Sequence, residues 1–183
     1  MSREEQNKWN AVYREGRLRS HFSGSRSVVV DWAEPMLPSR ARILDLGCGV
    51  LRNSQGLAEK GHHVLAVDVA RQAFHRARPW PQTLQPLVAD LDHWSIPVRA
   101  FDLIIMIHYL NRNLVASLIS ALRPQGFLAL EIRSPLPEEE KEPLPRYWLR
   151  LDEIPVLFPS LAVMELRPPA PQSKSVKALL RLS

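Results

Sequence analysis

Three aspartates stand at nearly equal distances along the chain, each close to the end of a short apolar segment. Asp45, Asp68 and Asp90 are separated by 23 and 22 residues. This distance fits one strand, one helix and their connections. If the apolar segments are parallel strands, their carboxyl ends meet at one edge of a sheet. The spacing therefore predicts that the three carboxylates line one ligand-binding edge.

A glycine turn directly follows the first of these segments. Gly47 and Gly49 flank Cys48, and glycine allows a tight turn and a close approach of the backbone to a ligand. A turn that merely joins a strand to a helix would look the same. A dinucleotide fingerprint needs a third glycine, whereas this chain has Arg52 at that place. A ligand without a diphosphate therefore suits the turn better than NAD does.

The second and third aspartates each allow two interpretations. Asp68 can accept hydrogen bonds from both hydroxyl groups of a ribose, or it can cap the helix that follows. Its place 19 residues after Gly49 favours the ribose. Asp90 can accept a hydrogen bond from an exocyclic adenine amine, or it can cap a turn. Together these residues indicate a nucleoside site.

The elements that must position these residues alternate between helix and strand. Such alternation is typical of an α/β fold with a mostly parallel sheet covered by helices on both faces. The run Leu103–Ile107 is apolar without alternation, as expected of a central strand. We expect helices over residues 4–15, 25–34, 52–60, 70–77 and 114–122, and strands over 42–46, 63–69, 84–89, 101–109, 127–132, 161–166 and 175–182.

The length of 183 residues predicts a single domain. We divide it into N-terminal helices over the ligand site (1–38), a ligand-binding core (39–134) and a C-terminal loop with closing strands (135–183). Residues 135–145 contain four prolines and four glutamates and are expected to form an exposed loop. Residues 167–175 are too rich in proline for regular structure, and we expect mobility there.

Composition excludes several classes of protein. The single cysteine, Cys48, cannot form an internal disulfide and fits a reducing, cytoplasmic location. The N-terminus has no apolar signal segment, and no apolar run is long enough to cross a membrane. The net charge of +5 suggests anionic partners, but the basic residues are scattered, as on an ordinary solvated surface. We expect no metal, because the side chains of His62 and His63 would point to opposite faces of a strand.

Five motifs together resemble those of class I S-adenosylmethionine-dependent methyltransferases. They are Ile43-Leu44-Asp45-Leu46-Gly47-Cys48-Gly49, Val67-Asp68-Val69, Ala89-Asp90-Leu91-Asp92, Phe101-Asp102-Leu103-Ile104 and Leu122-Arg123-Pro124-Gln125-Gly126-Phe127. They stand in family order, and the resemblance runs from about residue 8 to the C-terminus. It implies a Rossmann-like fold with a C-terminal antiparallel strand pair. It also implies S-adenosyl-L-methionine as cofactor and S-adenosyl-L-homocysteine as product.

A narrower resemblance points to the branch of tellurite-resistance protein B and thiol S-methyltransferases. Trp9 with Tyr13, the run Arg52-Asn53-Ser54 and the run Tyr109-Leu110-Asn111-Arg112 are similar to that branch. The chain departs from the pattern at two places. Leu51 and Gln125 stand where the branch usually has glycine, and Leu51 would narrow the loop beside the methionine moiety.

The resemblance also implies a role for each matching position. The backbone of Gly47 and Gly49 would contact the methionine and sulfonium end of the cofactor. Asp45 would orient the methionine ammonium. Asp68 would hold the ribose with Val69 beside it, and Asp90 with the backbone of Leu91 would read the adenine. A carbonyl at Ile107 or His108 would accept from the ammonium, and Tyr13 would close over the cofactor.

Methyl transfer from a sulfonium mainly requires alignment and a dry site. His108 is the candidate general base, although a histidine that only packs there is at least as compatible with the sequence. Arg112 and Arg133 follow two predicted strands and are candidates for holding an anionic acceptor, with a surface ion pair as the alternative. We predict a small, soft or anionic acceptor, such as a thiol or a chalcogen oxyanion, near Arg112.

Two other functions stay open. The basic pI favours an RNA methyltransferase, but the segment after the fourth strand is His108-Tyr109-Leu110-Asn111 rather than an Asn-Pro-Pro-Tyr type motif. A non-catalytic protein that binds S-adenosylmethionine is the second alternative, because of Leu51 and Gln125. We expect a small-molecule acceptor, no membrane and no nucleic acid as partners, with the chain a monomer or a homodimer.

Overall fold

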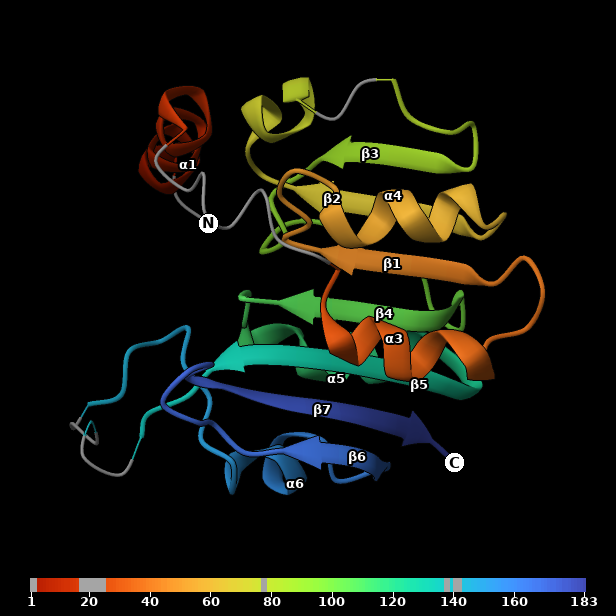
Figure 1. Cartoon of the computed structure of the whole chain (residues 1–183), viewed down its shortest axis with the longest axis vertical. Helices are drawn as coiled ribbons and strands as arrows, with labels where there is room; N and C mark the ends of the chain where they lie inside the picture. Colours follow the sequence, from red (N-terminus) through yellow and green to blue (C-terminus); the bar gives the residue numbers. More distant parts are fainter. Residues whose placement is uncertain (1–2, 17–25, 77–78, 137–138, 140–142) are drawn as a thin grey trace.

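A seven-stranded sheet forms the centre of the molecule (Figure 1). The computed structural model describes residues 3–16, 26–76, 79–136, 139 and 143–183. The strands lie in the order β3-β2-β1-β4-β5-β7-β6. They are β1 (Arg42–Leu46), β2 (His63–Asp68), β3 (Leu84–Val88), β4 (Phe101–Ile107), β5 (Leu122–Arg133), β6 (Leu161–Arg167) and β7 (Ser175–Leu182). The first five strands are parallel, and β7 is antiparallel to both β5 and β6, as the fold class predicted.

The strand order reverses direction between β1 and β4. From β1 the chain moves outward through β2 to β3, and then crosses back to place β4 on the other side of β1. In open parallel sheets, this reversal leaves a crevice beyond the carboxyl ends of the strands, where ligands bind. Asp45 in β1 and Asp68 at the end of β2 therefore reach the same crevice.

Helices cover both faces of the sheet. On one face lie α3 (Val28–Ala33), α4 (Arg52–Glu59) and the 3-10 segment η2 (Arg71–Arg76), and on the other lie α5 (Val115–Ala121) and α6 (Glu153–Leu157). Alternate residues of β4 serve the two cores: Ile105 packs on the α3 and α4 face, and Ile104 on the α5 face. The prediction that this strand is buried on both faces is confirmed.

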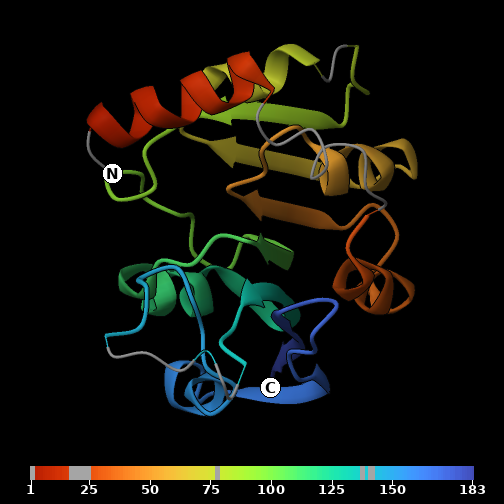
Figure 2. The same cartoon turned by 60° about the vertical axis from the view of Figure 1, so that its left-hand side comes forward.

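The helix α1 (Arg3–Glu15) lies near the carboxyl ends of the strands, on the side of β2 and β3 (Figure 2). Two side chains fix it there. The Nε2 of Gln6 donates to the carbonyl of Val69 at 3.2 Å, and the backbone N–H of Gln72 donates to the Oδ1 of Asn10 at 3.1 Å. The face of α1 that carries Trp9 and Tyr13 therefore covers the crevice.

The predicted elements differ from the structure in several places. The segment expected as a helix over 70–77 forms a tighter 3-10 turn, η2, because few residues are left there before Pro79. The helix expected from residue 25 begins at Val28 and continues as η1 (Glu34–Met36), and residue 25 lies outside the described residues. A 3-10 turn, η3 (Arg112–Leu114), precedes α5. The sequence did not predict α6, a short helix with one buried residue, Ile154.

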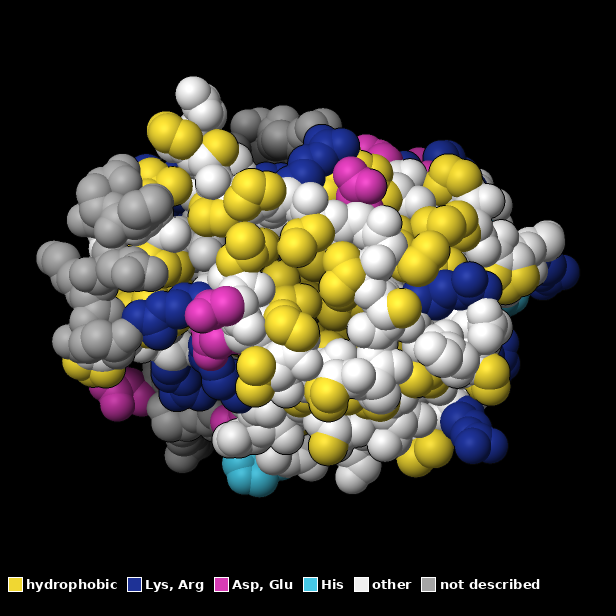
Figure 3. All heavy atoms as spheres, turned by 90° about the horizontal axis from the view of Figure 1, so that it is seen from below, with side chains coloured by type: hydrophobic (Ala, Val, Ile, Leu, Met, Phe, Trp, Pro, Cys, Tyr) yellow, Lys and Arg dark blue, Asp and Glu magenta, His cyan; other side chains and the backbone are white. Residues whose placement is uncertain are grey.

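The edge of the sheet at β6 carries an exposed apolar surface. Val163, Met164 and Leu166 of β6 and Val156 of α6 are all exposed. Figure 3 looks onto this end of the molecule and shows hydrophobic side chains gathered near its centre. The pairing of β6 with β7 shifts register between Val163 and Glu165, and such a bulge makes an edge strand less regular.

No helix among the described residues is long and apolar enough to span a membrane.

Candidate active site

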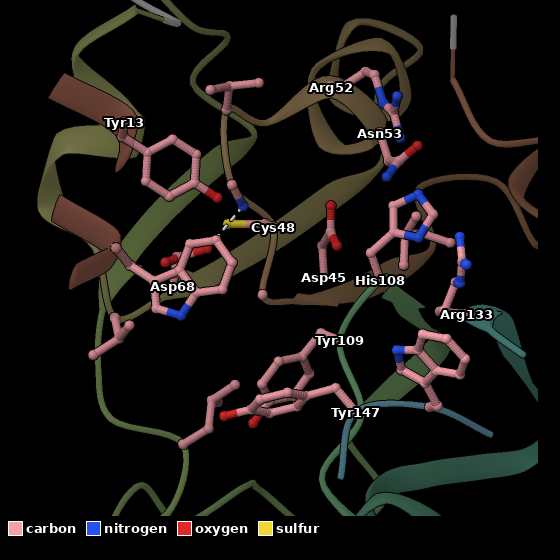
Figure 4. Close-up of a pocket in the computed structure, with 18 residues that line it drawn as sticks. Tyr13, Asp45, Cys48, Arg52, Asn53, Asp68, His108, Tyr109, Arg133 and Tyr147 are labelled. Atoms are coloured by element: carbon pink, nitrogen blue, oxygen red, sulfur yellow. Dashed lines mark hydrogen bonds between the residues drawn. The ribbon is translucent and has the colours of Figure 1, made fainter. Parts of the chain in front are cut away.

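A cavity of about 390 Å³ lies at the carboxyl ends of β1, β2, β4 and β5 (Figure 4). Its size is within the range of small-molecule sites. It brings together α1, the turn after β1, the start of α4 and the segment before α6. Its lining residues are Trp9, Tyr13, Asp45, Gly47, Cys48, Gly49, Val50, Arg52, Asn53, Asp68, Val69, Leu91, Ile107, His108, Tyr109, Arg133, Tyr147 and Trp148.

The glycine turn presents bare backbone to this cavity. Gly47 and Gly49 have positive φ angles of 63° and 55°. The N–H groups of Gly47 and Cys48 donate to the carbonyl of Val67, at 2.9 and 3.2 Å, which joins the turn to β2. A Cβ on Gly47 would lie 2.8 Å from the Cβ of Tyr109. Both the backbone angles and the space therefore require glycine here.

Asp68 performs a structural task and also faces the cavity. Its Oδ2 accepts from the N–H of Gly49 at 2.9 Å, and its Oδ1 accepts from the N–H of Ala70 at 2.8 Å. The residue is buried, and burial raises the pKa of its carboxyl group. Asp68 therefore caps the turn that follows β2, as one of the two interpretations proposed. The same carboxylate lines the cavity and can accept further hydrogen bonds there.

Asp45 is the more deeply buried of the two carboxylates. Its Oδ2 accepts a hydrogen bond from the Oγ of Ser54, at the start of α4, at 2.6 Å. Burial raises the pKa of Asp45 to about 7. The charge of Arg52 acts in the opposite direction, and a cationic ligand in the cavity would likewise favour the ionised form of Asp45. We call Asp45, Gly47, Gly49 and Asp68 the acidic side of the cavity.

The third aspartate is not where the sequence placed it. Asp90 is absent from the residues that line the cavity, whereas the next residue, Leu91, lines it. The carboxylate of Asp90 accepts from the N–H of Asp92 at 3.0 Å and contacts the Nδ1 of His93 at 3.0 Å. It caps the turn after β3, so this geometry does not support a direct contact of its side chain with adenine.

Tyr13 and Trp9 reach the cavity from α1. The hydroxyl oxygen of Tyr13 lies 2.9 Å from the position that a Cβ on Gly49 would occupy, so the ring closes against the turn. Figure 4 shows the ring pointing toward Cys48 and Asp68. Burial, together with the nearby charge of Asp68, raises the pKa of this phenol. The ring of Tyr13 therefore lies against the glycine turn, and its closing over a bound cofactor stays a prediction.

The opposite side of the cavity is aromatic and basic. It consists of His108, Tyr109, Arg133, Tyr147 and Trp148, which we call the aromatic side. The guanidinium of Arg133 lies over the ring of Trp148, 4.7 Å from its centroid. In Figure 4, His108 and Arg133 lie next to each other, across the cavity from Asp68.

His108 has an unusual backbone conformation, with a φ of 56°. Its N–H donates to the carbonyl of Glu131 at 2.7 Å, which ties the end of β4 to β5. A positive φ in a residue other than glycine costs conformational energy, and such strain often marks functional sites. Ile107 and His108 both line the cavity, as expected.

Cys48 lies inside the glycine turn, where burial raises the pKa of its thiol.

Arg112 does not line the cavity, in contrast to the prediction that it holds the acceptor. Its guanidinium forms an ion pair with Glu153 at 2.9 Å. It also donates to the backbone carbonyls of Arg146 and Trp148, both at 2.8 Å. Arg112 therefore fixes the segment that carries Tyr147 and Trp148. The surface ion pair was the alternative left open by the sequence, and the structure adds these two backbone contacts.

The sequence missed two residues of the aromatic side. Tyr147 and Trp148 follow a loop rich in proline and glutamate, and no motif singles them out. The hydroxyl of Tyr147 donates to Glu5 of α1 at 2.7 Å, so the two segments meet although 142 positions separate the residues. Two aromatic residues beside a polar loop were the one available signal. Asn53, which lines the cavity and accepts from the N–H of Ser27 at 3.0 Å, was noted only as part of a motif.

The two departures from glycine keep the backbone angles of glycine. Leu51 and Gln125 have φ angles of 65° and 66°. Leu51 is fully buried and packs in the core beneath α3 and α4. It is absent from the cavity lining, so its side chain does not narrow the site as the sequence suggested.

Among the described residues, no group of three or more His, Cys, Asp or Glu is arranged to hold a metal ion.

Comparisons with known proteins agree with this geometry. Residues 43–126 match the family model of the methyltransferase domain. YqeM of Bacillus subtilis, a protein named as a methyltransferase, is 30% identical over 115 residues, which cover 56% of this chain and 47% of YqeM. The chain therefore spans about half the length of this curated relative.

Solved structures share the fold at low sequence identity. The 1,6-didemethyltoxoflavin-N1-methyltransferase of Burkholderia thailandensis, solved with 1,6-didemethyltoxoflavin and S-adenosylhomocysteine, is 16% identical with a TM-score of 0.75, over 97% of this chain and 87% of that one. A TehB-like S-adenosylmethionine-dependent methyltransferase of Corynebacterium glutamicum is 20% identical with a TM-score of 0.70, over 97% and 99%. TehB of Haemophilus influenzae is 17% identical with a TM-score of 0.70, over 88% and 63%.

The matched residues 43–126 contain β1, the glycine turn, Asp68 and β4, which are the parts that shape the acidic side of the cavity. The sheet order and the antiparallel last strands are those of the class I methyltransferase fold. Residues 43–126 therefore resemble a methyltransferase domain, and the chain has the fold of the class I, S-adenosylmethionine-dependent methyltransferases.

Proposed function

We propose that this chain transfers the methyl group of S-adenosyl-L-methionine to a small-molecule acceptor, and that the acceptor is a soft or anionic nucleophile such as a thiol or a chalcogen oxyanion. One observation carries the proposal. A single cavity has two buried carboxylates and a bare glycine turn on one side, and a histidine and an arginine on the other. The acidic side suits a cationic cofactor, and the aromatic side suits an anionic acceptor.

The residues present fit S-adenosylmethionine. A ligand with a sulfonium and an ammonium needs nearby negative charge, which Asp45 and Asp68 supply. The glycine turn presents backbone without side chains to the cavity, and the methionine moiety would pass along it. The turn lacks the third glycine of a dinucleotide site, so it lacks the glycine-rich backbone that binds the pyrophosphate of NAD.

We assign the cofactor contacts to the residues that line the cavity. Asp68 would accept from the ribose hydroxyls, and Val69 and Leu91 would pack against the adenosine. Asp45 and a carbonyl at Ile107 or His108 would bind the ammonium. Tyr13 of α1 would cover the bound molecule and exclude water.

When bound, S-adenosylmethionine supplies an electrophilic methyl group, whose bond to sulfur breaks with the electron pair staying on sulfur as the acceptor forms the new bond. The protein then has to align the acceptor with that methyl group. We assign this task to the aromatic side, with Arg133 in place of Arg112 as the cation that faces the acceptor. His108 lies beside Arg133, and we assign to it the removal of a proton from a neutral nucleophile.

Calorimetry with S-adenosylhomocysteine and NAD tests the cofactor. We expect binding of S-adenosylhomocysteine at one site per chain and no measurable binding of NAD. Asp68→Ala should weaken the affinity for S-adenosylhomocysteine roughly 10- to 100-fold, since it removes two charge-assisted hydrogen bonds. The variant also loses the acceptor for Gly49 and Ala70, so circular dichroism should confirm that it is folded. Tighter binding of NAD than of S-adenosylhomocysteine would contradict the proposal.

The acceptor is tested by methyl transfer from labelled S-adenosylmethionine to a panel of thiols, selenite, tellurite and RNA. Turnover of a thiol or an oxyanion supports the proposal. Tight binding and methylation of RNA at about 0.2 M salt would favour the nucleic-acid alternative, because binding by diffuse charge is lost with salt. Cofactor binding without any turnover would favour a non-catalytic protein. Whether the chain is a monomer or a homodimer stays a prediction for light scattering.

A further inference from the structure

The aromatic side offers much more ring surface than a small inorganic anion or a short aliphatic thiol would use. Tyr109, Tyr147 and Trp148 all line the cavity on this side, and Tyr109 is partly buried. Tyr147 is held by Glu5, and Trp148 by Arg112 through its backbone carbonyl. Rings that are held in place can stack against a flat ligand with little loss of conformational entropy.

Arg133 is fixed beside these rings. Its guanidinium lies over Trp148, and its backbone carbonyl accepts from the N–H of Leu149 at 2.9 Å. Its Nε is buried and has no hydrogen-bond partner among the described residues. The nearest carboxylate, Glu139, lies 3.5 Å away and is shared with Lys174 at 2.5 Å. The guanidinium therefore keeps donor capacity for an anion in the cavity.

The charges of the cavity are distributed so that the two sides differ. Asp45 and Asp68 belong to the acidic side, whereas Arg133 and His108 face them across the cavity. An anionic group of the acceptor would be repelled by the carboxylates and attracted by Arg133. Its orientation is then set: the charge lies at Arg133, and the rest of the molecule lies between the aromatic rings and the cofactor.

From this juxtaposition we propose that the acceptor is a flat aromatic or heteroaromatic molecule that carries an anionic group, with the anion on Arg133 and the ring against Trp148 and Tyr147. This inference rests on the proposed function and narrows it, because it selects a planar organic anion over an inorganic oxyanion or an aliphatic thiol. Arg133 and Trp148 are then the residues that determine acceptor specificity.

The test is calorimetric binding of unreactive probes to the protein saturated with S-adenosylhomocysteine. The probes are 2-naphthoate, its neutral analogue 2-naphthamide, the non-planar decalin-2-carboxylate, and selenite. We expect 2-naphthoate to bind at least about tenfold more tightly than each of the other three. Arg133→Met should remove the preference for naphthoate over naphthamide, and Trp148→Leu the preference over decalin-2-carboxylate.

Arg167→Met is the matched control. Arg167 lies over the ring of Trp32, 4.5 Å from its centroid, and neither residue lines the cavity. This variant loses a similar arginine–tryptophan pair and should bind every probe as the wild type does. All variants should bind S-adenosylhomocysteine within about twofold of the wild type, which shows that they are folded.

The outcomes separate this inference from the proposed function. Failure of the wild type to bind S-adenosylhomocysteine contradicts the proposed function itself. Normal binding of S-adenosylhomocysteine together with no preference for 2-naphthoate contradicts only the present inference. The same holds if selenite binds more tightly than 2-naphthoate, or if Arg133→Met leaves the preference unchanged.

Discussion

The acidic side of the cavity draws its residues from positions 45–68, whereas the aromatic side combines residues from three separate segments, near positions 108, 133 and 147. The last of these segments contacts the helix α1. On the acidic side, short hydrogen bonds join neighbouring loops: Asp68 accepts from Gly49 and Ala70, and Asp45 from Ser54. On the aromatic side, Arg112 and Glu5 hold the segment with Tyr147 and Trp148.

This difference suggests how one fold can keep its cofactor while its acceptor changes. The acidic side is formed by strand ends and a turn, which the sheet itself fixes in space. The aromatic side takes Tyr147 and Trp148 from a segment after β5 that can differ in length and sequence without changing the sheet. Changes to the acidic side should therefore affect cofactor affinity, and changes to Tyr147 and Trp148 should affect the acceptor.

The largest effect is expected at the glycine turn. Gly47→Ala places a Cβ 2.8 Å from Tyr109 at a positive φ of 63°, so both the turn and the cavity must shift. We expect the affinity for S-adenosylhomocysteine to fall by about 100-fold or more, measured by calorimetry. Gly56→Ala is the control, because a Cβ there meets nothing within 4 Å. Normal binding by Gly47→Ala would show that the ligand does not pass this turn.

A smaller effect is expected from the residue that fixes the aromatic side. Arg112→Met removes the ion pair with Glu153 and the bonds to two backbone carbonyls. We expect kcat/KM for the acceptor to fall roughly 10- to 30-fold, with the affinity for S-adenosylhomocysteine unchanged within about twofold. Arg112→Lys keeps the charge but cannot reach all three partners, so it should restore only part of the activity.

Direct binding of the acceptor by Arg112 would give a different result. Arg112→Met would then weaken acceptor binding while the fluorescence of Trp148 stays as in the wild type. A positioning role predicts that the fluorescence changes as well, because the tryptophan loses its backbone contact. The difference spectrum between Arg112→Met and the double variant with Trp148→Phe isolates that signal.

The acidic side should also respond to pH. Burial raises the pKa of Asp45 to about 7, so the ionised fraction in the free protein rises from about 10% at pH 6 to about 90% at pH 8. The ammonium group of S-adenosylhomocysteine would bind the ionised form of Asp45, so affinity for this ligand should rise about tenfold over this range. Asp45→Asn should remove most of the rise, and the remainder reports on Asp68, whose pKa is also raised.

The stability of the free protein should change in the opposite direction. The unfolded chain releases the proton of Asp45 near pH 4, whereas the folded protein retains it until about pH 7. The folded state therefore binds more protons over this interval, and the contribution of Asp45 to the free energy of unfolding falls as pH rises through it. Urea titrations of the wild type and Asp45→Asn at pH 5 and pH 8 measure this contribution. An equal difference between the two proteins at both pH values would contradict the raised pKa.

The smallest effect is expected far from both sides. Gln125 is exposed and has a φ of 66°, at the register shift near the start of β5. Gln125→Gly relieves the backbone strain and should raise the free energy of unfolding by about 1 kcal/mol. Cofactor and acceptor binding should not change, because Gln125 does not line the cavity. A loss of stability would mean that the side chain of Gln125 contributes more than the strain costs.

The sequence by itself determined the order of elements and the acidic side. Apolar periodicity depends on near neighbours, so strands such as Phe101–Ile107 could be predicted with small errors at their ends. Gly47, Gly49 and Asp68 belong to the ends of strands, and parallel strands always bring these ends to one edge. Their meeting therefore follows from the topology alone.

Only the tertiary structure decided which charged side chains reach the cavity. Asp90 follows a strand as Asp68 does, yet its carboxylate caps a turn with His93, and Leu91 takes the place at the cavity. Arg112 turns to Glu153, 41 positions away, while Arg133 and Trp148 line the site. A long side chain can reach several partners that are distant in sequence. Which partner it binds depends on the packing and charge of the folded protein, which a local sequence pattern does not predict.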